Sequence, residues 1–494
     1  MGTDIPRTRF AAEDYQRFGL RLEHNLNQLR EQLAVAGFGE GPGSLGAELE
    51  IYIVGPDGRP LHLNEELQAD AADPQLTLEL NRYNLEYNLS PVALTAQPFQ
   101  RIETEIEQKL AALRQLAAAR DARIVPIGIL PTLQRSDFGP ACLTGKRRFK
   151  ALVAQLIERR GHRFQIDING QHPLQMEMDD ITLEGANTSF QVHYRVAPAQ
   201  FADTFNAIQA VTPLALAIAG NSPTLFGHKL WQETRIPLFK QSIDTRLPDR
   251  YSWNEPARVN FGHGWVRRDA AELFVETVRL YQPLLPVCLP EEAGTTAGPP
   301  ELPELQLHQS TVWLWNRPVY DAAAGGHLRI EMRALPAGPT STDMVANAAF
   351  LIGMAEGLRP NINTWLPALP FHIAEHNFYR AAQHGLEAKL VWPRDRQCAC
   401  EEQTAATIIA AMLPVARRGL AAIGIADCEA SRYLQIIERR LGSGQTGARW
   451  QLDQLARENN GDGARRPDPG ALAAMLDRFM VHSAGNTPVS DWPE

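Results

Sequence analysis

The sequence contains little cysteine, no excess of basic residues and no long uninterrupted apolar run. Its 494 residues include 5 cysteines, and the closest pair, Cys398 and Cys400, flanks a single alanine, which is not the usual spacing of a zinc-binding or redox pair. We therefore expect free thiols and a reducing compartment. The formal net charge of −9 argues against a nucleic-acid partner, because nucleic-acid-binding surfaces are typically basic.

The sequence also lacks the marks of secretion or of membrane insertion. Its N-terminal segment has no apolar core of a signal peptide. The apolar stretch at residues 211–220 is too short to span a bilayer and contains Pro213. We therefore expect a cytoplasmic protein with no membrane partner, and a homo-oligomer is compatible with the sequence.

Two glycine motifs resemble nucleotide-binding loops, and neither fits one. Residues 139–147 (GPACLTGKR) have one residue too many before Gly-Lys for a phosphate-binding loop, and Arg147 stands where Ser or Thr is required. Gly41, Gly43 and Gly46 match a dinucleotide-binding pattern by spacing, but they precede a strand instead of linking a strand to a helix. Any ATP must therefore bind by other means.

Several segments carry the apolar periodicity of helices, and others alternate like half-buried strands. The predicted helices cover residues 11–36, 103–122, 150–160, 199–219, 404–422 and 469–481, and a Pro-rich loop covers 286–303. The predicted strands cover residues 45–54, 85–89, 165–169, 175–179, 190–196 and 328–334. Strands with one aliphatic face predict an α+β fold in which helices cover one side of an antiparallel sheet.

The polar faces of these strands are unusual in composition. They carry acids, amides, one His and Arg, whereas Lys and Thr, which are common on solvated faces, are absent. One interpretation is an ordinary solvated surface, and the other is a polar cavity. The second interpretation suits phosphoryl transfer, since Mg²⁺ takes carboxylate ligands and arginine neutralises phosphate charge. The candidate carboxylates are Glu48, Glu50, Glu79, Glu86 and Glu331, with His193 as a further ligand and with Arg235 and Arg333 as anion-binding groups.

Other polar residues are further candidates for nucleotide or substrate contact. Gln191 and Arg195 share the polar face of His193, so we expect them to help bind the cofactor. Lys146 belongs to a basic cluster that is either solvated or bound to nucleotide phosphate. His308 and Arg317 are candidates for substrate contact.

Five sequence elements, in order, resemble the glutamate–cysteine ligase superfamily and especially its bacterial carboxylate–amine ligase branch. The resemblance covers roughly residues 45–335. The elements are Glu48 and Glu50 in GAELE, Glu79 and Glu86 followed by Asn88 and Ser90-Pro91, the strand Gln191-Val192-His193, the segment GNSP at 220–223 followed by Arg235, and RIEMRALP at 329–336. Tyr194 and Arg195 depart from the pattern, because many relatives carry His or Gly there.

The resemblance implies a fold like that of glutamine synthetase, with a curled antiparallel sheet of about six strands forming a funnel and helices outside. It implies that Mg²⁺ ions bridging ATP are held by Glu48, Glu50, Glu79, Glu86, His193 and Glu331. Arg235 and Arg333 would then act with Glu331 on the substrate carboxylate or the transferred phosphate. The implied reaction phosphorylates a carboxylate, with glutamate favoured, and an amine such as cysteine then displaces the phosphate.

Three regions and three functions follow as predictions. The regions are an N-terminal helical extension (1–43), a catalytic ligase domain (44–390) and a C-terminal helical segment (391–494). An ATP- and Mg²⁺-dependent ligase is the leading hypothesis. A metal-dependent amide or phosphoester hydrolase and a non-catalytic nucleotide-binding protein are the alternatives.

Overall fold

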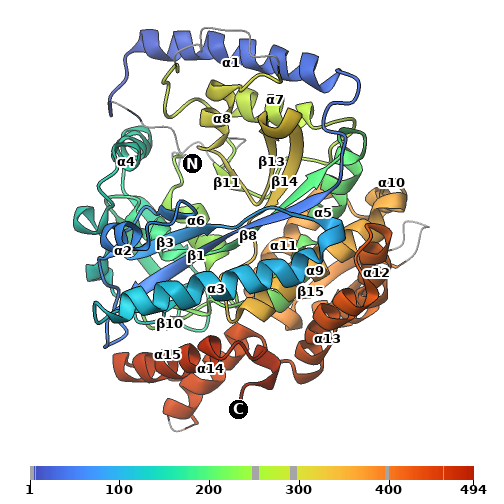
Figure 1. Cartoon of the computed structure of the whole chain (residues 1–494). Helices are drawn as coiled ribbons and strands as arrows, with labels where there is room; N and C mark the ends of the chain where they lie inside the picture. Colours follow the sequence, from blue (N-terminus) through green and yellow to red (C-terminus); the bar gives the residue numbers. More distant parts are fainter. Residues whose placement is uncertain are drawn as a thin grey trace.

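A computed structural model of the chain describes residue 5 and residues 7–246, 255–289, 298–394, 400–459 and 461–493. Figure 1 shows a sheet at the centre of the molecule, with helices around it and the C-terminal helices along its lower side. Cys398 and part of the predicted loop at 286–303 lie outside the described residues.

The main sheet is antiparallel and runs in the order β13-β14-β8-β1-β3-β2, with two further short strands, β4 and β5, paired to β1. Its strands are β1 (Ser44–Val54), β2 (Leu76–Leu78), β3 (Asn84–Asn88), β4 (Val92–Ala93), β5 (Arg123–Val125), β8 (Phe190–Val196), β13 (Asn316–Asp321) and β14 (His327–Met332). The sheet confirms the predicted antiparallel α+β class. Strand β13 escaped prediction because Pro318 interrupts it, and it lies at the edge of the sheet, where a strand proline is tolerated.

Two of the six predicted strands do not belong to this sheet. Strands β6 (Phe164–Ile168) and β7 (Leu174–Met178) pair with each other as a separate hairpin. The expectation that all six strands face one hollow is therefore wrong for this pair. The physical reason is that alternation fixes which side chains share a face, whereas the short connection between two strands lets them pair locally.

Besides the β6–β7 hairpin, three further two-stranded sheets of the described residues lie outside the main sheet. They pair β9 (Thr224–Leu225) with β10 (His228–Lys229), β11 (Val259–Asn260) with β12 (Trp313–Leu314), and β15 (Lys389–Pro393) with β16 (Cys400–Thr404). The β11–β12 pair is parallel, and it leads the chain into β13.

Helices surround the sheet, and two of them are almost completely buried. They are α1 (Ala12–Leu33), α2 (Asn64–Ala71), α3 (Pro98–Ala118), α4 (Arg147–Arg160), α5 (Phe201–Ala219), α6 (Arg235–Ser242), α7 (Ala271–Leu280), α8 (Pro303–Gln309), α9 (Ser341–Leu358), α10 (Ile362–Trp365), α11 (Phe371–His384), α12 (Ala405–Ala422), α13 (Asp427–Ser443), α14 (Gly447–Glu458) and α15 (Pro469–Ala484). The buried pair, α5 and α9, packs together in the core. Tyr194, from the aliphatic side of β8, donates a hydrogen bond to Glu356 of α9 at 3.0 Å, which ties the sheet to this helix layer.

Close helix packing depends on glycine where α9 meets α12. A Cβ atom on Gly419 would lie 2.0 Å from the carbonyl oxygen of Gly353, a distance that no side chain permits. Helix α12 and the segment Pro198–Ala219, which includes α5, are long and apolar enough to cross a membrane by length and composition. The apolar window of the segment with α5 is 89% buried, which is typical of a core helix, and that of α12 is 39% buried. Residues 211–219 of the apolar stretch belong to α5, in agreement with the helix predicted at 199–219.

Candidate active site

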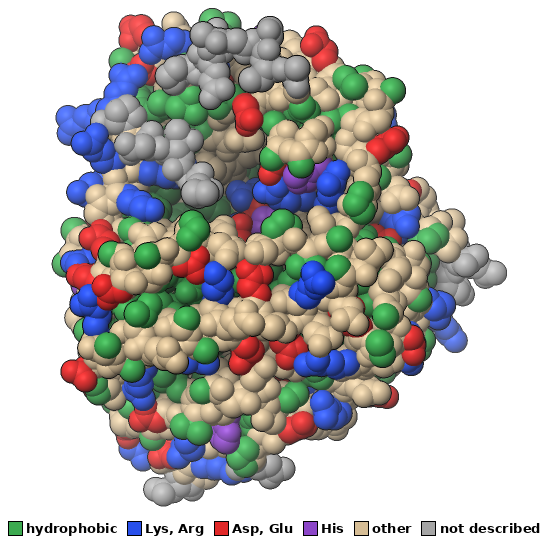
Figure 2. All heavy atoms as spheres, in the orientation of Figure 1, with side chains coloured by type: hydrophobic (Ala, Val, Ile, Leu, Met, Phe, Trp, Pro, Cys, Tyr) green, Lys and Arg blue, Asp and Glu red, His purple; other side chains and the backbone are tan. Residues whose placement is uncertain are grey.

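The polar face of the main sheet lines a cavity of about 1200 Å³. Figure 2 shows the surface hollowed in the upper half of the molecule, with basic, acidic and histidine side chains gathered within the hollow. The polar side chains that could bind ligands in the cavity include five carboxylates, one amide and three basic groups. They are Glu48, Glu50, Glu79, Glu86, Glu184, Gln191, Lys146, Arg317 and Arg333.

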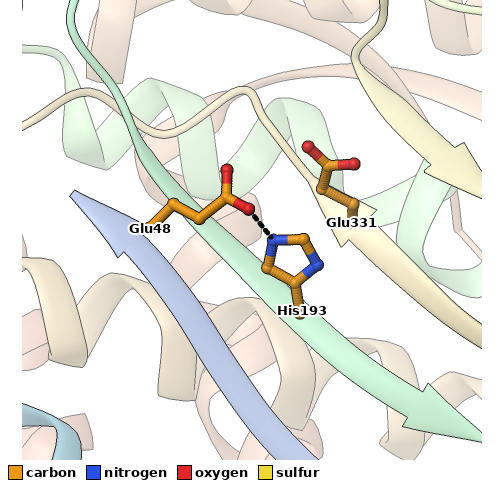
Figure 3. Close-up of side chains that lie close together, drawn as sticks. All are labelled: Glu48, His193 and Glu331. Carbon is orange, nitrogen blue, oxygen red and sulfur yellow. Dashed lines mark hydrogen bonds and ion pairs between the residues drawn. The ribbon is translucent and has the colours of Figure 1, made fainter. Parts of the chain in front are cut away.

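Three predicted site residues meet at the centre of the polar face. His193 on β8 lies opposite Glu331 on β14 and next to β1, which carries Glu48. The Nε2 atom of His193 lies 3.0 Å from Oε1 of Glu48, and one ligand atom from each of the three residues lies within 4.8 Å of the others (Figure 3). Figure 3 shows the three side chains converging from separate strands. Such a set could hold a metal ion.

Glu331 is a fully buried carboxylate held between two arginines. Arg317 on β13 donates to its Oε2 at 2.6 Å, and Arg333 donates to its Oε1. Burial alone would raise the pKa of Glu331, but the two guanidinium groups outweigh it and hold the pKa well below its usual range. Arg333 also donates to Gln191, whose amide donates to Glu50 at 2.9 Å. These contacts link the centre of the face to its acidic end.

At the acidic end, carboxylates face one another with little compensating positive charge. Glu50 and Glu86 are direct partners across β1 and β3. Burial and, in addition, the negative charges of Glu48 and Glu50 raise the pKa of Glu86 to about 8. Burial and Glu50 likewise raise the pKa of Glu184 to about 8. The pKa of Glu79 is raised by burial and by its carboxylate neighbours, and burial raises that of Glu50 despite Arg333.

These shifts fit a hard cation. A carboxylate whose pKa is raised by burial and by like charges pays for ionisation unless a positive charge comes close. A divalent cation removes that cost and accepts carboxylate oxygens as ligands. Glu48, His193 and Glu331 could therefore bind one cation, and Glu50, Glu79 and Glu86 line the adjoining cavity. Perturbed carboxylates of this kind are also typical of functional sites.

The structure separates three of the candidate residues, Arg235, Arg195 and His308, from this cluster. Arg235 is 3% exposed, donates to Glu233 at 2.7 Å and to the carbonyl of Ala334 at 2.6 Å, and does not line the cavity. Because the Arg235 guanidinium is bonded to Glu233 and Ala334 in the interior, it does not reach the cavity. Arg195 lies beyond His193 on β8, next to the glycine loop, where Gly41 leaves room for it.

Lys146 precedes helix α4 and lines the cavity of the carboxylates, whereas Arg195 lines a different pocket. His308 is buried, its Nε2 lies 3.2 Å from the carbonyl of Thr277, and it does not line the cavity. Sequence reasoning thus grouped residues that the fold places in different surroundings.

Two functional candidates were missed in the sequence. Glu184 lies in a short 3₁₀ turn, where no alternation marks which side chains face a cavity. Arg329 had been placed only as a polar strand residue, yet its Nε donates to Nδ1 of His193 at 3.2 Å and its Nη1 donates to Asp321 at 2.6 Å. The charge and strand position of Arg329 were readable signals, whereas nothing in the local sequence marks Glu184.

Three solved structures show a distant similarity to this chain. A glutamate–cysteine ligase (gshA) from Francisella tularensis in complex with AMP shares 12% sequence identity over 92% of this chain and 96% of its own, with a TM-score of 0.49. A bifunctional glutathione synthetase from Pasteurella multocida shares 11% identity over 94% of this chain and 55% of its own, with a TM-score of 0.47. The ligase PafA, in complex with the prokaryotic ubiquitin-like protein Pup, shares 10% identity over 90% of this chain and 79% of its own, with a TM-score of 0.37.

No curated protein matches the sequence. The family model for glutamate-cysteine ligase family 2 (GCS2) matches residues 44–468, which include every strand of the main sheet and every cavity residue named above. The resemblance found in the sequence motifs is thereby confirmed. The chain belongs to glutamate-cysteine ligase family 2 and is an enzyme that joins a carboxylate to an amine.

Proposed function

We propose that this enzyme uses ATP and Mg²⁺ to form an amide through an acyl phosphate. The observation that carries the proposal is that Glu48, Glu50, Glu79, Glu86, Arg317 and Arg333 line one cavity, while His193 and Glu331 lie directly beside Glu48 and the two arginines. A site of this composition suits phosphoryl transfer, in which positioning and charge stabilisation supply most of the catalysis.

The reaction has two steps. A carboxylate oxygen of the first substrate attacks the γ-phosphorus of ATP, the bond to the β-phosphate oxygen breaks, and ADP leaves. The nitrogen of the amine then attacks the acyl carbon, inorganic phosphate leaves with the bonding electrons, and the nitrogen loses a proton to water. Phosphorylation is needed because a free carboxylate has no good leaving group.

The residues around Glu331 have a defined part in both steps. Arg317 and Arg333 are fixed by Glu331, so their remaining N–H groups are pre-oriented toward charge that develops on the phosphoryl oxygens. Glu48, Glu50, Glu79, Glu86, His193 and Glu331 are the proposed holders of Mg²⁺. When bound, Mg²⁺ supplies positive charge to the phosphate chain and to the carboxylate.

The triphosphate has a preferred end of the polar face. Arg329 lies directly opposite Arg195 across β14 and β8, and Asp321 pairs with Arg329, whereas no carboxylate in the described part of the chain pairs with Arg195. Nε of Arg195 is buried and has no hydrogen-bond partner in the described part of the chain. We therefore assign the nucleotide phosphates to the end of the face with Arg195 and Arg329, called here the arginine end. Lys146 stays a candidate for a nucleotide contact from the cavity.

Glutamate is the proposed carboxylate, and cysteine or another amine is the proposed acceptor. We also propose a cytoplasmic location, and a homo-oligomer stays compatible with the sequence. The division at residues 1–43, 44–390 and 391–494 stays a prediction, and Arg235 as a catalytic group is no longer part of the proposal because it is buried away from the cavity.

The direct test is ADP release by the pure protein with ATP, Mg²⁺ and pools of carboxylates and amines. The proposal expects ADP formation that requires one carboxylate and one amine together, with the amide found by mass spectrometry. Glu331→Gln is the inactive control. ADP release that no carboxylate stimulates, or amide turnover without ATP, would contradict the ligase mechanism, and the second result would favour a metal-dependent hydrolase.

A further inference from the structure

The cavity extends beyond the acids to an apolar wall that the proposed phosphoryl transfer does not use. This wall is formed by helix α4 together with side chains from near α8 and β12. Its partly exposed side chains are Phe149, Leu152 and Trp313, and it also includes the buried side chains of Leu156, Ile181, Ile243 and Leu307. The whole cavity of about 1200 Å³ has room for more than one small substrate, since pockets of roughly 300–1000 Å³ hold ligands of drug size.

Glu184 lines the same cavity, and its carboxylate has no polar partner in the described part of the chain. Its carboxylate makes no hydrogen bond or ion pair with any residue that the structure describes, although the turn that carries it is otherwise largely buried. Glu184 is also not among the residues proposed to hold Mg²⁺. A desolvated carboxylate in this position favours a cationic ligand.

The two ends of the polar face carry opposite charge, so we expect each substrate to bind at the end whose charge is opposite to its own. The triphosphate carries several negative charges and is drawn to Arg195 and Arg329 at the arginine end. An amine that arrives as an ammonium ion is drawn to the opposite, acidic end, where Glu79 and Glu184 lie beside the apolar wall. The wall thus shares a cavity with Glu79 and Glu184, whereas Arg195 and Arg329 do not line that cavity.

We propose that the amine substrate is a primary amine with a bulky apolar group, whose ammonium binds Glu184 and whose apolar group packs on Leu152 and Trp313. The inference rests on the ligase function proposed above and names the acceptor class for the same site. Trp313 is fixed against Phe239 with their ring centroids 6.2 Å apart, so the wall is a rigid surface for a ring or a branched chain.

The first test compares methylamine, isoamylamine, phenethylamine and cysteine as acceptors, with ADP release and amide mass as readouts. The proposal expects kcat/KM to rise at least about 10-fold from methylamine to phenethylamine, because each buried methylene adds to transition-state binding. Equal or better use of methylamine or cysteine would overturn it. No ADP release with any amine would instead overturn the ligase function, so the two failures are distinguishable.

Variants of the wall provide the second test. Leu152→Trp should lower kcat/KM for phenethylamine by more than it lowers kcat/KM for methylamine, so the preference for phenethylamine is lost, and the KM for ATP should not rise. Ile157→Trp is the matched control, because Ile157 lies on the same helix, is 37% exposed and does not line the cavity. Trp313→Ala should move the preference toward larger amines, which keeps the inference testable if Leu152→Trp fails to fold. A raised KM for ATP in Leu152→Trp would show that the wall holds the adenine ring and would overturn the proposal.

Glu184 is tested by its own variant. Glu184→Gln should raise the KM for every amine by about 10-fold or more and leave the KM for ATP within about 2-fold, since a charged hydrogen bond to the ammonium is lost. An unchanged KM for amines in Glu184→Gln would contradict the assigned role.

Discussion

The polar face of the main sheet and the polar face of the β6–β7 hairpin have the same sequence pattern and different surroundings. Both alternate aliphatic residues with acids and amides. On the hairpin, the side chain of Glu177 is 50% exposed and pairs with Arg163 at the surface, whereas the side chain of Glu331 in the main sheet is fully buried between Arg317 and Arg333. Alternation thus predicts which side chains share a face, and the tertiary packing decides whether that face meets water.

The difference lies in what covers each face. Helix α4 and side chains near α8 and β12 enclose the polar face of the main sheet, so its charges are desolvated and interact strongly. The hairpin face has no such cover, because Gln165, Asp167, Gln175 and Glu177 are all exposed. The solvated interpretation considered for the sequence is therefore correct for the hairpin and wrong for the main sheet.

The largest expected effect separates Glu331 from Glu177. Glu331→Gln leaves Arg317 and Arg333 facing each other without a carboxylate and removes a proposed metal ligand, so kcat/KM should fall on the order of 10³-fold. Glu177→Gln should leave kcat/KM unchanged, because its carboxylate is on the hairpin surface. Steady-state ADP release measures both variants, and a comparable loss in both would erase the distinction between the two faces.

Replacing arginines on the two faces should change kcat/KM by somewhat less than replacing Glu331. Arg333→Gln should lower kcat/KM by about 10²-fold, since Arg333 lines the cavity and is poised to stabilise transferred charge. Arg163→Gln on the hairpin should have no effect on activity. Arg235→Gln should instead destabilise the protein by about 3–5 kcal/mol, because it leaves Glu233 buried without its partner.

Chemical denaturation and kinetics together measure these three variants. A catalytic loss in Arg235→Gln that exceeds its loss of folded protein would mean that Arg235 acts on substrate despite its burial.

The sequence predicted the strands of the site better than their assembly. The segments that became β1, β3, β8 and β14 were identified from alternation, and Glu48, His193 and Glu331 were placed correctly on one face. The pairing of β6 with β7 and the burial of Arg235 depend on contacts between distant segments, which local periodicity does not encode. Glu184 could not be found because its turn has no period.

The arginine end should show a more modest effect. Arg195→Gln removes one of two opposed arginines that lie beyond the cavity, so the KM for ATP should rise by about 10-fold while kcat changes little. Initial rates at varied ATP test this, and Arg163→Gln is again the control. A raised KM for the amine, with ATP unaffected, would place the phosphates elsewhere.

The smallest expected effect is the pH dependence of the protein's stability that arises from the acidic end. The pKa values of Glu86 and Glu184 are raised to about 8, so the folded state holds protons that the unfolded chain has released. The stability that follows from this is present below the ordinary carboxyl pKa and is lost as pH rises toward 8. The Tm of the metal-free protein should fall by about 3–5 °C between pH 5 and 8, and Mg²⁺ should reverse much of the fall. Calorimetry across pH measures the change, and a rising Tm would contradict it.

The central claim is that the enclosed polar face, and not the exposed one, holds divalent metal together with nucleotide. Mn²⁺ replaces Mg²⁺ as a spectroscopic probe, and electron paramagnetic resonance measures its uptake with a non-hydrolysable ATP analogue. Our account predicts nucleotide-dependent Mn²⁺ binding in the wild-type protein and in Glu177→Gln, with strong loss in Glu48→Gln and Glu331→Gln. Undiminished binding in both of the latter variants would contradict it.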